Sequence, residues 1–197
     1  MATVKRSNPT AFSDIISHLK ELEGKVGRAG WFESAVYPDG TPVATIAAQN
    51  EFGGTINHPG GTPYKIGPDG QAIFVTKAEG AGLPMTKPHT IVIPPRPFMR
   101  PTIDREKNNW LNAMAEGAKD VLAGKVSAGE VMEDVAMRAA ADVAKTITQV
   151  YSPPLKPATI AARRRKMSNQ KIVGSLDKPL VASGIMLATV TGKSENA

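Results

Sequence analysis

The chain has 197 residues, of which 41% are hydrophobic and 5% aromatic, and it carries a formal net charge of +6 at pH 7. This length suits one domain, or one domain with appendages, and the sparse aromatic residues indicate that part of the chain lacks a core of its own. The absence of cysteine excludes disulfides, zinc–thiolate sites and thiol nucleophiles, and it fits a protein made in a reducing cytoplasm.

The positive charge lies at one end of the sequence. Residues 1–150 hold 16 basic and 16 acidic side chains, whereas residues 151–197 hold 8 basic and 2 acidic ones, so the whole excess lies in the last segment. This pattern predicts a folded body, 1–150, and a basic C-terminal arm, 151–197, that meets an acidic partner. No apolar run reaches the roughly 20 residues of a membrane span, and the N-terminus lacks the apolar core of a signal peptide.

The first part of the chain predicts helix, strand and helix in turn. Apolar residues recur at helical spacing over residues 10–23, and Gly24 ends that helix. Residues 25–34 are short and loosely alternating, which predicts a strand. After the turn sequence YPDGTP, residues 43–52 predict a short helix that ends at a Gly-Gly pair.

Glycine and proline dominate the middle of the chain. Residues 53–71 hold six glycines and three prolines, which predicts a long loop. Residues 72–77 and 89–95 are rich in β-forming side chains, and we expect them to pair as a β-hairpin with a long tip over 78–88.

Two long helices follow the prolines around residue 100. Residues 101–125 and 127–151 both carry apolar side chains at helical spacing. Ser127 stands three residues before Glu130, the spacing of a capping box, so the second helix is expected to begin there. Its predicted apolar seam consists of Val131, Val135, Ala139, Val143 and Ile147.

Sequence signatures of catalysis are missing. The chain has no Gly-x-Ser-x-Gly elbow and no glycine-rich phosphate loop. His18 lacks a second ligand at helical spacing. His58 and His89 could meet across a hairpin, but structural roles are favoured because a two-histidine site would still need a carboxylate. A hydrolase that pairs one of them with Glu51 is the least favoured class, and no catalytic residue, metal site or cofactor is expected.

The strongest charge cluster is a run of four cations, Arg163, Arg164, Arg165 and Lys166. Such a run can contact phosphates and make binding depend on salt. It contains no aromatic residue for base stacking, and no base-reading fold accompanies it. A solvated or protein-facing basic helix is therefore favoured, with contact to DNA as the alternative. The alternative function is accordingly a nucleic-acid-binding protein that acts through the basic arm.

The stretch IPPRPFMRP, residues 93–101, has two readings from its residues. Its PPRP core could bind an SH3-type groove as a polyproline helix. It is, however, fused to a predicted strand before it and a predicted helix after it, with Phe98 and Met99 as apolar anchors and Pro101 suited to a first helical turn. A rigid corner between strand and helix is therefore favoured, with Arg96 and Arg100 held at a defined surface.

Three ordered blocks of the sequence are similar to a known family. These are AAQNEFGG (47–54), IPPRPFMRP (93–101), and PPLKPATIAARRRK (153–166) followed by KPLVASGIMLATVT (178–191). Together they resemble the small neck and tail-completion proteins of tailed bacteriophages. The segment between Gly53 and His89 is longer than the family's short link, which suggests an insert with a contact of its own.

The resemblance implies an α+β fold, in which helices pack a small twisted antiparallel or mixed sheet with a long β-hairpin, and the basic arm extends from it. It also implies a structural virion protein with no enzymatic activity, at the head-proximal end of the tail. Such subunits form a homo-oligomeric ring around the DNA channel, with a hexamer favoured over a dodecamer because six matches tail symmetry. The implied partners are further copies of the chain, head-side connector proteins, tail-tube or tail-terminator proteins and the genomic double-stranded DNA, with no membrane.

The motifs also suggest which residues make assembly contacts. The candidates are Glu51, Phe52, Arg96, Pro97, Phe98 and Arg100. The basic cluster, Arg163 to Lys166, is the candidate surface for DNA or a partner ring.

Overall fold

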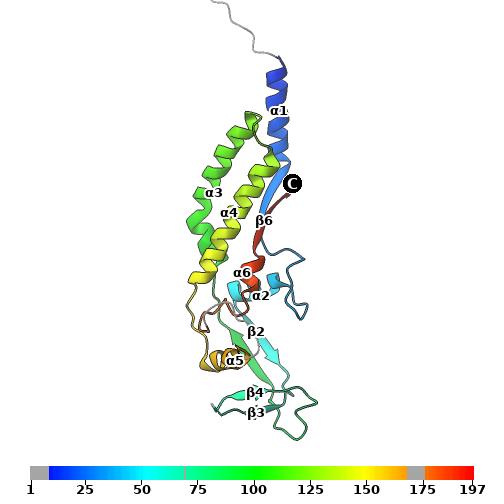
Figure 1. The fold of residues 1–197 in the computed structure, drawn as a ribbon, viewed down its shortest axis with the longest axis vertical. Helices are drawn as coiled ribbons and strands as arrows, with labels where there is room; N and C mark the ends of the chain where they lie inside the picture. The colour runs from blue at the N-terminus through cyan, green and yellow to red at the C-terminus, as the bar shows by residue number, and fades with distance from the viewer. Residues whose placement is uncertain (1–8, 69, 168–175) are drawn as a thin grey trace, which may run out of the picture. The chain divides into compact units, whose positions relative to one another are not determined.

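The computed structural model describes residues 9–68, 70–167 and 176–197 (Figure 1). The protein has the predicted α+β fold, with helices and small antiparallel sheets. It divides into two compact units: unit 1 comprises 1–32, 100–145 and 190–197, and unit 2 comprises 33–99 and 146–189. The division therefore does not fall at the predicted boundary after residue 150, because the last residues of the chain belong to unit 1.

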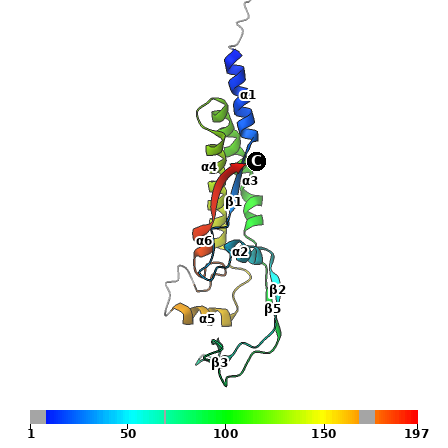
Figure 2. The same cartoon turned by 90° about the vertical axis from the view of Figure 1, so that its right-hand side faces the viewer.

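Unit 1 combines long helices with one two-stranded sheet. Its elements are α1 (Pro9–Glu23), β1 (Lys25–Gly30), most of α3 (Met99–Leu122), most of α4 (Ala128–Gln149) and β6 (Thr191–Asn196). These bounds confirm the predicted helices and the predicted strand after residue 24. Strand β6 pairs antiparallel with β1, from Lys25 opposite Asn196 to Gly30 opposite Thr191, and the two strands run side by side in Figure 2.

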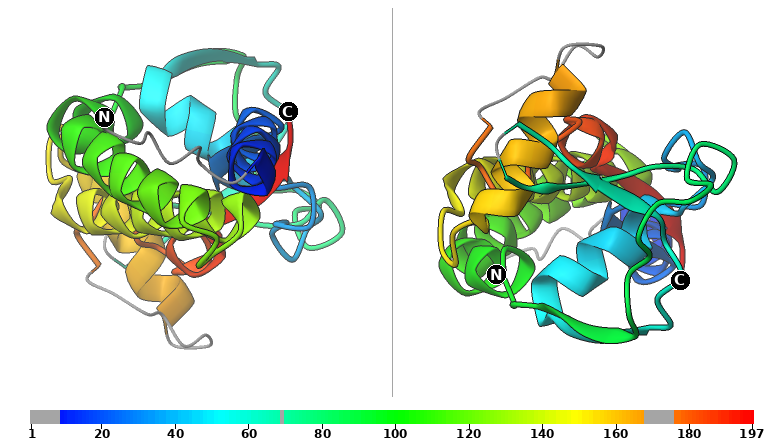
Figure 3. Two further views of the ribbon diagram at one scale, coloured as in Figure 1. Left: turned by 90° about the horizontal axis from the view of Figure 1, so that it is seen from above. Right: turned by 90° about the horizontal axis from the view of Figure 1, so that it is seen from below.

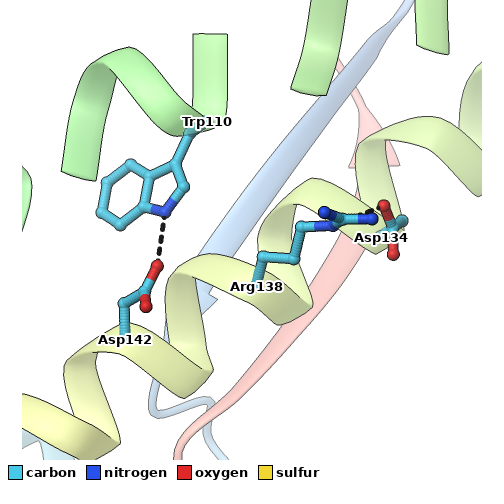
Figure 4. A network of polar contacts seen from close by, with 4 residues as sticks. All are labelled: Trp110, Asp134, Arg138 and Asp142. Carbon is cyan, nitrogen blue, oxygen red and sulfur yellow. Dashed lines mark hydrogen bonds and ion pairs between the residues drawn. The ribbon is translucent and has the colours of Figure 1, made fainter. Parts of the chain in front are cut away.

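Helices α3 and α4 are joined by a short turn and pack against each other. Val121 and Ala128, on either side of the turn, are fully buried and cluster with Val131. Farther along the helices, Trp110 Nε1 donates a 2.8 Å hydrogen bond to Asp142 Oδ2 (Figure 4). The whole predicted seam of α4, from Val131 to Ile147, is buried, so its helical periodicity is confirmed.

The start of α4 is capped as its sequence predicts. Ser127 Oγ accepts a hydrogen bond from Glu130 N (3.2 Å), and Glu130 Oε2 accepts one from Ser127 N (2.8 Å), the reciprocal pattern of a capping box. The hydrogen bonds that Ser127 donates to the Glu130 carboxylate, from its backbone N–H and then from its hydroxyl, lower the pKa of that carboxyl below its ordinary value. Glu21 of α1 adds a further acceptor, since its Oε1 receives the N–H of Ala128 at 3.0 Å.

Unit 2 holds α2 (Val43–Phe52), α5 (Pro157–Met167) and α6 (Ile185–Thr189) together with four short strands. Strand β2 (Gly54–His58) pairs antiparallel with β5 (His89–Ile93), and β3 (Tyr64–Ile66) pairs antiparallel with β4 (Ala72–Phe74). Helix α2 confirms the predicted short helix, and it packs against α6. Arg165 of α5 donates to the carbonyl of Ala72, and Figure 3 shows α5 beside the β3–β4 segment.

Two predictions about the strands are wrong. Residues 72–77 and 89–95 do not pair with each other, because β4 pairs with β3 and β5 pairs with β2. Both new partners lie within residues 53–71, which the glycine and proline content had marked as a loop. Across the described residues the strands form three separate two-stranded sheets instead of one small sheet.

The C-terminal segment is not an extended arm over its described length. Residues 157–167 form α5, residues 185–189 form α6, and residues 191–196 are paired in β6. The terminus is fixed to unit 1 by its backbone, since Ala197 N donates to the Gly24 carbonyl at 3.0 Å. Among the helices that the structure describes, none is long and apolar enough to cross a membrane.

Candidate functional site

Glu51 fixes the start of helix α3. It lies near the end of α2 with 3% of its surface exposed, and its Oε2 accepts hydrogen bonds from Phe98 N (2.7 Å) and Met99 N (2.9 Å). Met99 is the first residue of α3 and Phe98 directly precedes it, so their N–H groups have no partner within the helix. A carboxylate there is stabilised both by the hydrogen bonds and by the positive end of the helix dipole.

The backbone next to Glu51 makes a second connection between the same two motifs. Arg96 N donates to the Asn50 carbonyl at 2.6 Å. Gly53 then turns the chain with φ at +73°, and a Cβ there would lie 2.8 Å from the Ile93 carbonyl oxygen. Only glycine combines a positive φ with such a close approach. The EFGG and IPPRPF motifs therefore form one bonded corner, as the rigid-corner interpretation of residues 93–101 predicts.

Arg96 connects this corner to the third motif block. Its side chain is 7% exposed, its Nε donates to the Pro153 carbonyl at 2.8 Å, and its Nη2 donates to the Pro154 carbonyl at 3.3 Å. Burial lowers the pKa of the Arg96 guanidinium below its ordinary value. Because Arg96 and Phe98 are both buried, the PPRP stretch is part of the packed structure and is not presented as a free polyproline ligand.

Arg163 joins the two halves of the third block. Its Nη1 donates to the carbonyls of Lys178 (2.6 Å) and Leu176 (3.3 Å), and its Nη2 donates to the Pro179 carbonyl (2.9 Å). Burial, and then the neighbouring charge of Arg96, lower the pKa of the Arg163 guanidinium. The two arginines from distant motifs therefore lie close enough to repel each other.

A pocket of about 710 Å³ opens beside these two arginines within unit 2. The polar and charged residues of its lining are Tyr37, Asp39, Thr41, Asn50, Arg96, Arg163 and Ser183. The apolar part of the lining comes from Pro38, Ile46, Leu155, Pro179, Leu180, Ala182 and Met186. Every motif block thus contributes to the wall of one pocket.

The predicted assembly contacts divide into buried and exposed residues. Glu51, Arg96 and Phe98 are buried, with Phe98 fully so, and they hold the corner together. Phe52 is 67% exposed, and Pro97 and Arg100 are also exposed. The exposed three remain candidates for partner contacts, whereas the buried three act through the fold.

The basic run 163–166 does not form one continuous surface. Arg163 turns toward carbonyl groups of its own unit, and Arg165 is half-buried with a bond to Ala72. Arg164, between them, is exposed. The side chain of Lys166 lies outside the described part of the structure. A helix places consecutive residues about 100° apart, so a run in sequence cannot all face one way.

The two histidines meet, but not beside Glu51. His58 and His89 are opposite each other on β2 and β5, and their rings stack with centroids 5.0 Å apart. They stand four residues along β2 from Gly54, which is about 13 Å at the usual rise of a strand. The Glu51 carboxylate instead accepts the N–H groups of Phe98 and Met99. Among the described residues, no three His, Cys, Asp or Glu side chains are placed to hold a metal ion.

Comparison of the chain with models of protein families, with curated proteins and with solved structures found no match. The resemblance to phage neck proteins therefore rests on the sequence motifs alone.

The bonds of Arg163 predict a difference between two neighbouring arginines. We expect Arg163→Ala to lower the melting temperature by about 5 °C, because it removes three hydrogen bonds to carbonyl groups at a cost of about 2 kcal/mol. Arg164→Ala removes the same charge from an exposed position and is expected to change the melting temperature by less than about 1 °C. Scanning calorimetry measures both. Equal changes in melting temperature would contradict the inference that the bonds of Arg163 hold the two halves of the third block together.

Proposed function

We propose that the chain is a structural virion protein of a tailed bacteriophage, which forms a ring at the neck and joins the tail to the head connector around the DNA channel. The observation that carries this proposal is the bonding of all the motif blocks in unit 2. Glu51 binds the backbone of the second block, and Arg96 of that block binds the backbone of the third. These bonds bring the three blocks together in one unit, as a shared structural role of the blocks would require.

Exposed apolar side chains support assembly into a ring. On α1, Phe12 and Leu19 are 67% and 50% exposed, and on the β2–β5 ladder Ile56 and Val92 are 42% and 59% exposed. We take these two elements as candidate contact surfaces, since apolar patches mark protein interaction sites. We infer that further copies of the chain, connector proteins on the head side and tail-tube or tail-terminator proteins cover them in the virion, in a ring for which six copies match tail symmetry.

The geometry gives less support to a nucleic-acid-binding protein. Arg163 and Arg165 donate to backbone carbonyls of unit 2, and only a cation that faces solvent can release counterions from a DNA phosphate. Arg164 is exposed and remains available for such contact. We therefore propose that DNA passes the protein in the channel without being its main ligand. The chain itself acts as a joining subunit without catalytic activity.

Electron microscopy of particles from a phage with a nonsense codon in this gene tests the proposal. We expect DNA-filled heads beside separate tails of finished length, because the joining subunit is missing. Particles from a suppressing host, which restores the full chain, are the control. Overlong or unstable tails would instead assign the chain to termination of tail growth. Intact infectious particles would contradict a structural role.

A further inference from the structure

The lining of the Arg96–Arg163 pocket holds two guanidinium groups and one carboxylate, that of Asp39, so its positive charge is only partly balanced. Both guanidinium groups line the same pocket, and the charge of Arg96 contributes to the lowered pKa of the Arg163 guanidinium after burial, the larger cause. Two like charges in a partly desolvated site raise the free energy of the folded state unless an anion compensates them.

Hydrogen bonds to carbonyls use only some of the N–H donors of these two arginines. Each guanidinium has five N–H donors. The bonds of Arg96 use two donors and those of Arg163 use three, which leaves three and two. Carbonyl oxygens fix the orientation of both groups without removing their charge. An acceptor with a negative charge would match the remaining donors and balance the charge.

The partners that the structure gives for both arginines are carbonyl oxygens. Asp39 is the acidic residue in the pocket lining, but its Oδ1 accepts the Thr41 N–H at 3.0 Å, and hydrogen bonds from Thr41 lower the pKa of its carboxyl. Glu195 near the end of the chain is paired with Arg28 in unit 1. Segments 1–8 and 168–175 contain no acidic residue, and Asp69 is the sole acid outside the described ranges.

The burial of Arg96 and the apolar lining of the pocket favour one kind of anion. Arg96 is 93% buried, since only 7% of its surface is exposed, and the surrounding wall includes Ile46, Leu155, Leu180 and Met186. The phosphates of a DNA duplex lie on a stiff backbone and contact cations at the protein surface. A peptide can insert one side chain or a chain end into such a recess and lay apolar neighbours against its wall.

We propose that the Arg96–Arg163 pocket binds a carboxylate carried by an acidic peptide segment of a protein partner. Arg163 has Nε and one Nη2 hydrogen to donate, and Arg96 has Nη1, so a planar carboxylate can receive charge-assisted bonds from both groups. Tyr37 and Ser183 belong to the same lining. The inference does not depend on the partner being a virion protein.

Peptide titrations of the full chain test this site, followed through the arginine Nε–H signals in NMR spectra. The probes are N-acetyl-Leu-Asp-Leu-amide, its Asn counterpart as an amide, and the Asn counterpart with a free chain end. We expect the Asp peptide to shift the signals of Arg96 and Arg163 saturably, and to bind at least about tenfold more tightly than the Asn amide, because a charged acceptor makes the stronger bond. Tight binding of the free-end peptide would identify a terminal carboxylate as the natural group.

Two variants of equal size provide the matched control. Ala182 lines the pocket and is half-buried, so Ala182→Glu places a carboxylate beside the arginines and Ala182→Gln places a neutral side chain there. We expect Ala182→Glu to weaken the Asp peptide at least about tenfold more than Ala182→Gln does. Equal effects of the two variants would overturn the proposal, as would equal binding of the Asp and Asn amides in the unmodified chain or no binding at all. Stronger shifts with inorganic phosphate or a short DNA duplex would also overturn it, in favour of a phosphate site.

Discussion

Glu51→Ala is expected to destabilise the start of helix α3 by about 3 kcal/mol, because it leaves two buried backbone donors without their charged acceptor. Those donors are the N–H groups of Phe98 and Met99, and Phe98 is fully buried. Water cannot replace the carboxylate there without opening the corner. Hydrogen exchange of these two amides should accelerate about a hundredfold, which is the factor that such a free energy implies.

Variants at the same position separate charge from geometry. Glu51→Gln keeps an oxygen acceptor but loses the charge, so we expect it to cost about half as much as alanine. Glu51→Asp keeps the charge on a side chain one methylene shorter, which moves the carboxylate away from both donors. The control is Glu133→Ala, an exposed position on α4, where the change should stay within about 0.5 kcal/mol. Unchanged exchange of the Phe98 and Met99 amides in Glu51→Ala would show that the carboxylate is not their partner.

The helices were predictable because their signals are local. The apolar seam from Val131 to Ile147 repeats at helical spacing, and the capping box of Ser127 and Glu130 marks where the helix begins. Burial was less predictable than helix formation. Ile103 and Leu111 of α3 are 44% and 58% exposed although they lie on its apolar side, since a single sequence does not reveal which stripes find a partner.

The pairing of strands was not predictable from the same kind of pattern. The sequences AIF and HTIVI predict strands but do not specify which segment each one pairs with. Their partners, β2 with its Gly, Asn and His residues and β3 beside prolines, carry residues that are common in loops. Strand β6, TGKSEN, has no apolar alternation at all. It forms because a preceding strand and a helix are placed to receive it.

The sequence identified the important residues of the corner but not their role. Glu51, Arg96 and Phe98 stand in the motifs, and a charged residue is ordinarily expected at the surface. The structure buries both charges because backbone groups receive them: two N–H groups for Glu51 and two carbonyls for Arg96. Nearly every residue type supplies a backbone N–H and a carbonyl group, so the sequence does not show which residues provide these partners. The bonds could therefore not be inferred from it.

A close approach between sheet and helix leads to the second large expected effect. Strand β6 crosses α4 at Gly192, where a Cβ would lie well under 3.0 Å from the backbone atoms of Ala136 and Met137. Gly27 of the paired strand β1 approaches α4 in the same way, with the Met132 carbonyl 2.7 Å from the position of a Cβ. Backbone atoms cannot rotate aside as a side chain can. A methyl group at either position therefore forces the strand and the helix apart.

We expect Gly192→Ala to lower the free energy of unfolding of unit 1 by about 3 kcal/mol, the upper end of what overpacking usually costs. Both tryptophans of the chain, Trp31 and Trp110, lie in this unit, so chemical denaturation followed by tryptophan fluorescence reports on it. The separation of strand and helix should also weaken the pairing of β6 with β1, and hydrogen exchange of the β6 amides should rise with it.

Gly129→Ala is the matched control, because it adds the same methyl group to the first turn of α4 with no contact closer than 3.9 Å. Alanine is the better helix former, so this variant should raise stability by about 0.5 kcal/mol. The two substitutions are therefore expected to have opposite signs although their chemistry is identical. A Gly192→Ala protein as stable as the unmodified chain would mean that β6 does not rest on the backbone of α4, and that the pairing of β1 with β6 holds the terminus in place without the helix.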